Sequence, residues 1–239
     1  MTHPQQAPHG FRRFLCNSCG HFIDVPIHCA SKACGVCTAI RGWRIRERIQ
    51  YALQGLKQDR VYRWRHIVLT VKNSYDLDDR LDHLVKSFRK LRQRKLWKST
   101  QYGGFYVIEI TEGTDGWHPH LHIVSYGSFL PWRKLRAAWL ALTKDSFHVQ
   151  VTSIRDGSNI GYYISKYITK AVTLTSASIV TLDEICRNRR LFGPFGKCAL
   201  LMKKFRPPDK FYPCPKCGVH EWIPEFILDM MNRRASQFT

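Results

Sequence analysis

Two histidines separated by one residue are the first feature of the sequence with the chemistry of a reactive site. His120 and His122 flank Leu121 in a stretch with the composition of a β-strand. Side chains at positions i and i+2 of a strand project from the same face, so both imidazoles point one way and Leu121 points into the core. Two imidazoles on one face form half of a metal site, and the sequence therefore predicts a bound metal ion here.

The third ligand is expected to be a carboxylate from the paired strand, where Glu109 and Glu112 compete. If Asp115-Gly116 is the two-residue turn of a hairpin, Glu109 lies opposite His122 and Glu112 points to the other face. This register favours Glu109. Two histidines and one carboxylate with open coordination positions suit Mg²⁺ or Mn²⁺ acting on a phosphate, with zinc as the alternative.

The other histidines near these positions are expected to have different roles. His118 is separated from the pair by Pro119 and is a candidate for contacting DNA. His66, His83 and His148 stand alone in the sequence and are predicted to be structural or surface residues.

A second group of reactive side chains has helical spacing. At about 100° per residue, Tyr163, Tyr167 and Lys170 fall within an arc of about 60° on one helix face, with Lys166 beside them. A tyrosine oxygen can attack a phosphodiester and form a phosphotyrosine link, and lysines can stabilise the charge that develops. A tyrosine pair alone is typical of core packing. Together with the histidine pair, it predicts a tyrosine nucleophile.

The elements that position these side chains follow a mixed pattern. Strands are expected at 65–72, 105–110, 121–125 and 148–152, and helices at 41–56, 77–97, 131–142 and 159–170. The central order β-α-β-β-α-β-α predicts a sheet with helices packed on it. Residues 191–196 contain two glycines and a proline and are expected to form a loop.

The charge of the chain indicates its class of partner. Lys and Arg number 38 against 18 acidic residues, a formal net charge of +20, which favours nucleic acid over an acidic membrane. No apolar run approaches the roughly 20 residues of a membrane span, and the N-terminus does not resemble a signal peptide. A cytoplasmic protein is expected. The sequence has no phosphate-binding loop of the Gly-x4-Gly-Lys-Ser/Thr type, which argues against a helicase or ATPase.

Nine cysteines in a chain without a secretory signal argue against a disulfide framework. Near the N-terminus, Cys16, Cys19, Cys34 and Cys37 form two Cys-x2-Cys pairs with the spacing of a zinc site. These four are the expected ligands of a structural Zn²⁺ ion, and Cys29 is an alternative for one of them.

The other cysteine cluster lies near the C-terminus. Cys214, Cys217 and His220 resemble half of a zinc knuckle, which Cys198 or Cys186 could complete. The alternative is a turn that binds no metal. Cys186 by itself is expected to be a buried apolar residue.

Three motifs in chain order resemble those of the HUH endonucleases. They are Ile67-Val68-Leu69-Thr70-Val71, His120-Leu121-His122 and Tyr163-x-x-Lys166-Tyr167-x-x-Lys170. The set is most similar to the rolling-circle replication initiators of plasmids and small single-stranded DNA phages, and it covers about residues 60–172.

The resemblance implies an α+β fold with an antiparallel sheet of RNA-recognition-motif type. It implies that Glu109, His120 and His122 hold the metal, that Tyr167 is the nucleophile, and that Tyr163 is a second nucleophile. The enzyme would nick single-stranded or hairpin origin DNA, leaving a 5′-phosphotyrosine adduct and a free 3′-OH primer. A host helicase and polymerase would be its partners.

Two other functions are compatible with the same residues: a rolling-circle transposase and a non-catalytic, zinc-dependent DNA-binding regulator. A Cys-rich head precedes the nuclease in both initiators and transposases, so the cysteines do not separate them. The expected division of the chain is a disordered start (1–10), a Cys-rich zinc-binding segment (11–40), a basic helix or linker (41–60), the endonuclease domain (61–172) and a C-terminal segment with the second knuckle (173–239).

Overall fold

The computed structural model describes residues 10–27, 29, 31–56, 62–155, 157–169, 176–205 and 213–227. The chain divides into a larger unit, residues 30–205, and a smaller unit made of residues 1–29 and 206–239. The smaller unit is therefore built from both ends of the chain. This division corrects the expected one, because the segments 11–40 and 173–239 are each shared between the two units. Most of the start that was expected to be disordered, residues 1–9, lies outside the described residues.

The larger unit contains a five-stranded antiparallel sheet with the strand order β6-β3-β5-β4-β7. The strands are β3 (Arg63–Thr70), β4 (Gln101–Gly113), β5 (Gly116–Gly127), β6 (Val149–Ile154) and β7 (Phe192–Phe195). Strand β5, which carries both histidines of the expected metal site, lies at the centre of the sheet. The predicted α+β fold with an antiparallel sheet is confirmed.

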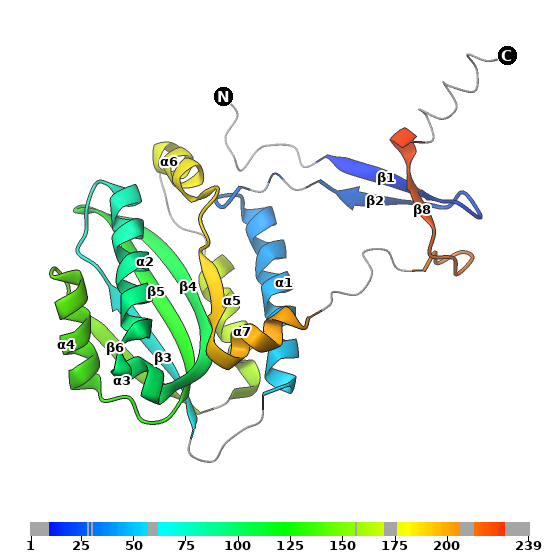
Figure 1. Ribbon diagram of the computed structural model, residues 1–239. Coiled ribbons are helices and arrows are strands. Elements are labelled where there is room, and N and C mark those ends of the chain that lie inside the picture. The colour runs from blue at the N-terminus through cyan, green and yellow to red at the C-terminus, as the bar shows by residue number, and fades with distance from the viewer. Residues whose placement is uncertain are drawn as a thin grey trace. The chain divides into compact units, whose positions relative to one another are not determined.

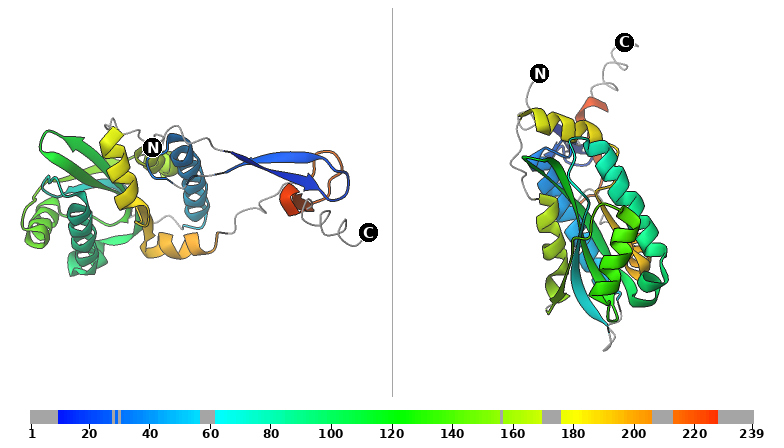
Figure 2. Two further views of the ribbon diagram at one scale, coloured as in Figure 1. Left: turned by 90° about the horizontal axis from the view of Figure 1, so that it is seen from above. Right: turned by 90° about the vertical axis from the view of Figure 1, so that its left-hand side faces the viewer.

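Helices cover both faces of this sheet (Figure 1; Figure 2, right). On one face lie α2 (Leu77–Gln93), α3 (Lys95–Thr100) and α4 (Trp132–Thr143), with α6 (Ser176–Cys186) packed into the same core. On the other face lie α1 (Gly35–Gln54), α5 (Ile160–Thr169) and α7 (Gly196–Lys203), and a 3-10 turn (Gly157–Asn159) leads into α5. Among the helices described, none is both long and apolar enough to cross a membrane.

Helix α2 shows how the local sequence determines an element. The Asp76 side chain accepts a hydrogen bond from the backbone N–H of Asp79 at 3.0 Å, which caps the first turn. Acidic residues in the first turn and basic residues in the last turn both suit the helix dipole. The helix ends at Gln93 because Arg94 is extended, so the single helix expected over 77–97 is instead α2 followed by α3. The apolar side chains that α2 buries recur at helical spacing: Leu77, Leu81, Leu84, Phe88 and Leu91.

The segment expected to be a loop at 191–196 is largely the edge strand β7. It pairs with β4, with Phe195 opposite Gly104 and Pro194 opposite Phe105. A proline has no N–H to donate to a neighbouring strand, so it is tolerated at the edge of a sheet and not inside it. The glycine and proline predicted a break in structure, and the edge position explains why a strand forms in spite of them.

The smaller unit contains a three-stranded antiparallel sheet with the order β2-β1-β8 (Figure 1). Its strands are β1 (Phe11–Cys16), β2 (Phe22–Pro26) and β8 (Trp222–Pro224). β1 and β2 are the two arms of a hairpin, and the Arg13 guanidinium pairs with Asp24 across them at 2.9 Å. β8 pairs with the other edge of β1, so the two ends of the chain share one sheet.

Two neighbouring residues of α2 test the packing of the larger unit. Leu84 is fully buried and Val85 is 37% exposed. We expect Leu84→Ala to lower the free energy of unfolding by about 2–5 kcal/mol, because the side chain leaves a cavity in the core. Val85→Ala should change it by about 0.5 kcal/mol or less. Urea denaturation followed by tryptophan fluorescence measures both, and equal losses would contradict the buried face of α2.

Candidate active site and metal centres

The turn between β4 and β5 sets the register of the candidate metal ligands. Gly113 pairs with Gly116, so the two-residue loop is Thr114-Asp115 and not the expected Asp115-Gly116. Gly116 has a φ of +91°, and a Cβ there would lie 2.6 Å from the carbonyl oxygen of Ser74. The glycine is therefore required at the start of β5, where the chain passes close to Ser74, and not in the loop.

This turn changes the pairing but keeps the face. Glu109 lies opposite His120, whereas the sequence predicted that it lies opposite His122. The loop lies one residue earlier than predicted, so the partner of each residue on β4 lies two residues earlier on β5. Because side chains on a strand alternate between the faces with period two, a shift of two residues keeps each side chain on the same face. Glu109, His120 and His122 accordingly share one face of the sheet. Glu112 lies on the other face, where its carboxylate accepts a hydrogen bond from Ser178 at 2.8 Å.

The three candidate ligands converge on the face covered by α1 and α5. Glu109 Oε2 lies 2.7 Å from His122 Nε2, and each of these two residues is only 7% exposed. His120 is half-buried, and its ring centroid is 6.0 Å from that of His122. Thr111 Oγ1 lies 3.4 Å from His120 Nε2. The His118 ring packs against the His120 ring, with 4.1 Å between centroids.

This set of donors fits a divalent cation. A carboxylate oxygen and two imidazole nitrogens are hard and intermediate ligands, and they suit a metal that keeps positions open for phosphate oxygens. The burial of Glu109 supports the same interpretation, since a buried carboxylate needs a compensating positive charge. The identity of the ion stays a prediction.

His66 joins the site, which corrects the expectation that it stands alone. It is buried on β3, and its Nε2 lies 3.1 Å from Nδ1 of His122. On its other side, His66 Nδ1 lies 3.0 Å from the hydroxyl oxygen of Tyr163. Burial, together with the charges of His122 and Lys166, lowers the pKa of His66 to about 4, so the ring is neutral near pH 7.

The one sequence signal for His66 was its position on the strand. It has the same parity as Val68, which lies opposite His122, so the two histidines point to one face. That inference needs the knowledge that β3 is the neighbour of β5. The order of strands in a sheet arises from pairing between segments far apart in the sequence, and the local spacing of residues does not predict it.

Helix α5 places its tyrosines against the same site. The Tyr167 ring stacks on the His122 ring with 3.8 Å between centroids and an interplanar angle of 17°. The Tyr163 ring lies 6.0 Å from that of Tyr167. Lys166 Nζ lies 4.0 Å from the Tyr163 ring centre and 4.9 Å from that of Tyr167. Tyr162 is 63% exposed and belongs to another face of the helix.

Burial raises the pKa of Tyr167, and the nearby Tyr163 and Glu109 raise it further. The neutral phenol is therefore the resting form, and ionisation during attack requires additional positive charge. Lys166 supplies part of that charge within the described residues. Lys170, which the sequence placed on the same face, lies outside them.

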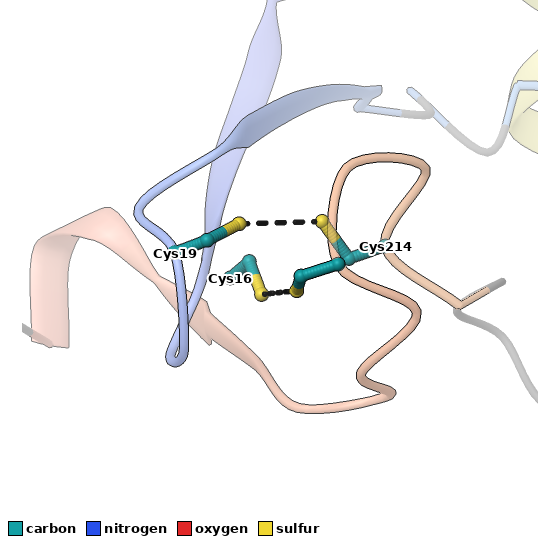
Figure 3. Close-up of side chains that lie close together, drawn as sticks. Cys16, Cys19 and Cys214 are labelled. Atoms are coloured by element: carbon teal, nitrogen blue, oxygen red, sulfur yellow. Dashed lines mark hydrogen bonds between the residues drawn. The ribbon is translucent and has the colours of Figure 1, made fainter.

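In the smaller unit, four cysteine sulfurs come together from the two ends of the chain (Figure 3). Cys16 Sγ lies 3.5 Å from Cys217 Sγ, and Cys19 Sγ lies 3.6 Å from Cys214 Sγ. All four lie within 4.8 Å of one another. A disulfide would place its sulfurs about 2 Å apart, so these pairs are thiols. Four such thiols could hold a metal ion such as zinc.

Both cysteine pairs belong to turns of the same construction. Each has the sequence Cys-x-x-Cys-Gly, and the glycine N–H donates to the carbonyl of the first cysteine. The bond is 2.9 Å for Gly20 to Cys16 and 2.7 Å for Gly218 to Cys214. Both glycines have a positive φ, +69° and +75°, a conformation that costs a residue with a Cβ more than it costs glycine. Two equivalent knuckles therefore face each other.

This pairing corrects the expected ligand set. Cys16 and Cys19 were predicted to share a metal with Cys34 and Cys37, which instead belong to the larger unit. There Cys34 caps helix α1, with its sulfur accepting a hydrogen bond from the backbone N–H of Cys37 at 3.5 Å. Cys29, the expected alternative ligand, is not one of the four, but its sulfur and those of Cys34 and Cys37 lie within 4.8 Å of one another, so these three could also hold a metal ion.

The C-terminal site is corrected in the same way. Cys198 was a candidate to complete it, but this residue is fully buried in the core of the larger unit, and burial raises its pKa to about 12. His220 is exposed and is not among the four grouped residues. Cys186 is fully buried in an apolar cluster, as predicted.

Comparison with known proteins identifies the family. Residues 21–154, more than half of the chain, match the family model described as "Replication protein". A "Protein rep" from a Bacillus species is 27% identical over 140 residues, which cover 54% of this chain and 44% of the relative. A second "Protein rep", from Bacillus amyloliquefaciens, is 26% identical over 140 residues and covers 54% and 40%. No solved structure matches.

The chain thus spans less than half the length of the two relatives described. The matched region contains β3, β4 and β5, and so the expected metal ligands, but it ends before the tyrosines of α5. The resemblance to rolling-circle replication initiators is confirmed at the level of the family: this chain belongs to the replication-protein family.

Proposed function

We propose that this protein initiates rolling-circle replication by nicking single-stranded or hairpin DNA at an origin. One observation carries the proposal. The Tyr167 ring stacks on His122, and His122 in turn touches Glu109, so a hydroxyl nucleophile and a candidate metal site share one buried position. Family membership supports replication as the process, and the net charge of +20 supports DNA as the partner.

The reaction proposed is a transfer of one phosphodiester bond. The Tyr167 oxygen attacks the phosphorus of the origin strand, and the bond between phosphorus and the 3′ oxygen breaks. Tyr167 loses its proton, and the departing 3′ oxygen gains one, which leaves a 3′-OH primer and a 5′-phosphotyrosine adduct. A host polymerase would extend the primer, and a host helicase would open the duplex.

Glu109, His120 and His122 would hold Mg²⁺ or Mn²⁺ in this proposal. When bound, such an ion polarises a phosphoryl oxygen and stabilises the negative charge of the transition state. The side chains around it orient the substrate. Lys166 adds positive charge near both tyrosines, which favours the ionised form of the nucleophile.

His66 is proposed to position His122 for this role. Metal-bound histidines commonly donate their second ring N–H to a partner, which fixes the tautomer. In this site His122 Nδ1–H would donate to His66 Nε2, which leaves His122 Nε2, the atom beside Glu109, for the metal. His66 would then carry its own proton on Nδ1 and donate it to the Tyr163 hydroxyl. Tyr163, held in this way, is the second nucleophile.

A structural zinc ion in the smaller unit is the second part of the proposal. Zinc bonded to four thiolates at about 2.3 Å in a tetrahedron places its sulfurs about 3.8 Å apart. The distances of 3.5 and 3.6 Å between the paired sulfurs fit this arrangement. The metal would join two short knuckles that have little apolar core between them, and its binding would therefore stabilise the folded unit directly.

The metal assignment predicts different effects for the two candidate glutamates. The unmodified protein should nick a labelled origin oligonucleotide in Mn²⁺. Glu109→Gln should reduce nicking by on the order of 100-fold or more, since even the partners of metal ligands are worth about 10–100-fold. Glu112→Gln, the matched control on the opposite face, should nick normally.

Titration with Mn²⁺ gives a second readout of the same substitution. Glu109→Gln should weaken Mn²⁺ binding, and Glu112→Gln should not. The reverse order of the two variants would refute the assignment. If the unmodified protein binds the oligonucleotide but never cuts it, the protein is a DNA-binding regulator and not a nuclease.

The tyrosines are predicted to have separate tasks. Tyr167→Phe should eliminate the first covalent protein–DNA adduct, because phenylalanine lacks the attacking oxygen. Tyr163→Phe should still form that adduct but fail in the second transfer, which closes the released circle. Tyr162→Phe is the control, since Tyr162 is exposed on another face. Peptide mapping of the trapped adduct identifies the residue, and phosphotyrosine at Tyr162 or at Tyr163 alone would overturn these roles.

The zinc assignment is tested by metal content. Cys217→Ser should lower the zinc bound per chain by one ion and reduce the thermal stability of the smaller unit. Cys198→Ala should leave the zinc content unchanged, because Cys198 lies in the apolar core of the larger unit. Elemental analysis of purified protein measures both. Loss of zinc from the Cys198 variant, or no zinc in the unmodified protein, would contradict the ligand set.

A further inference from the structure

A cavity of about 340 Å³ opens beside the proposed nucleophile in the larger unit. Tyr167 forms part of its wall, so whatever occupies the cavity reaches the reactive tyrosine. Its apolar lining comes from Ile45 of α1, Val107 and Ile108 of β4, and Leu191 and Phe192 at the sheet edge. The rest of the wall is strongly basic and consists of Lys32, Arg41, Arg44, Arg48, Arg189 and Arg190, with Thr38.

Three of these cations form a regular row on α1. Arg41, Arg44 and Arg48 have the spacing i, i+3 and i+7, which places them on one face of a helix. Seven residues of helix span about 10 Å, and the long arginine side chains can each reach a different phosphate of a strand that runs along the helix. The row therefore has the length and the charge to follow several consecutive phosphates.

The charged groups of this wall are cations, and some of them have partners elsewhere in the protein. Arg189 is paired with Asp78 and Asp82, but none of the described residues that line the cavity is acidic. Burial lowers the pKa of Lys32, the charge of Arg41 lowers it further, and Cys186 and Asp183 raise it. Crowded cations repel one another, and an anion in the cavity would relieve this repulsion.

The other large cavity near the site has a different character. It measures about 570 Å³ and lies at the far ends of β3 and β5, near His118. Lys72 is accompanied there by two carboxylates, Asp115 and Asp145. The mixed charge does not favour a row of phosphates, so the cavity beside Tyr167 is the better candidate for the DNA backbone.

We infer that the DNA strand next to the scissile phosphate occupies the cavity beside Tyr167, with successive phosphates on Arg41, Arg44 and Arg48. The apolar wall at Ile45 and Phe192 faces the sugars and bases of the same strand. This inference rests on the proposed function, since it places the substrate relative to the proposed nucleophile. It gives α1, which lies outside the three sequence motifs, a direct part in substrate binding.

The salt dependence of binding tests this inference without any cleavage. A short labelled single-stranded oligonucleotide is titrated with the full-length protein, with no divalent metal added, at about 50 to about 200 mM salt. The double variant Arg44→Gln, Arg48→Gln should bind more weakly. The slope of log K against log salt should also become shallower by about 1.4, at about 0.7 for each phosphate that the variant no longer neutralises.

Arg46→Gln is the matched control. Arg46 lies on the same helix with the same charge, but it packs beside Gly161 of α5 and does not line the cavity. Its slope should equal that of the unmodified protein. An unchanged slope in the double variant, or an equal change in Arg46→Gln, would overturn the inference, because only the general charge of α1 would then matter.

The failure of this inference can be told apart from a failure of the proposed function. Nicking by the unmodified protein in Mn²⁺ tests the chemistry, and the salt slope tests the path of the strand. Normal nicking with unchanged slopes would refute only the path. An altered slope in the double variant, combined with no nicking by the unmodified protein, would support the proposed path of the strand and refute the proposed nuclease activity.

Discussion

The hydrogen bonding of β5 to both β3 and β4 is the constraint on which the site depends. Strand β5 is central, so its neighbours present side chains on both sides of His122. β4 contributes Glu109 on one side, and β3 contributes His66 on the other. These positions follow from backbone pairing, because the pairing register decides which side chains lie next to one another on neighbouring strands. A slip of one residue in either ladder would send the ligands of that strand into the opposite core.

The burial of Glu109 explains why the neighbouring groups form one connected set. A carboxylate in an apolar interior is costly unless a positive charge and hydrogen bonds compensate it. His122 Nε2 lies nearest to the Glu109 carboxylate, His66 contacts the other nitrogen of His122, and Tyr163 continues the chain of contacts. The Tyr167 ring stacks on the same histidine. A metal ion bound by Glu109 would supply the positive charge that the buried carboxylate needs. Because Tyr167 of α5 packs against this site, the affinity for the ion would depend on the packing of α5.

The spacing of residues along the sequence predicted those features that depend on the geometry of a single helix or strand. The helical spacing of α2 and the shared face of His120 and His122 came from periodicity alone, and the choice of Glu109 over Glu112 held the correct face even though the turn was displaced by one residue. Long-range pairing was not predictable in this way. The role of His66 requires the order of strands, and the strand β7 requires an edge at β4 that accepts Pro194.

The cysteine ligands could also not be paired correctly from the sequence. Spacing identified each Cys-x-x-Cys turn, but nearness in sequence paired Cys16 and Cys19 with the wrong partners, since β8 joins the ends of the chain. The described residues of this unit carry three basic and three acidic side chains: Arg12, Arg13 and Lys216, and Asp24, Glu221 and Glu225. Four thiolates around one Zn²⁺ ion would add a formal charge of about −2. The described part of the unit would then carry a small net negative charge. A zinc centre that joins the two knuckles would stabilise the folded unit directly, and the basic face of α1 in the larger unit is the surface proposed for the DNA backbone.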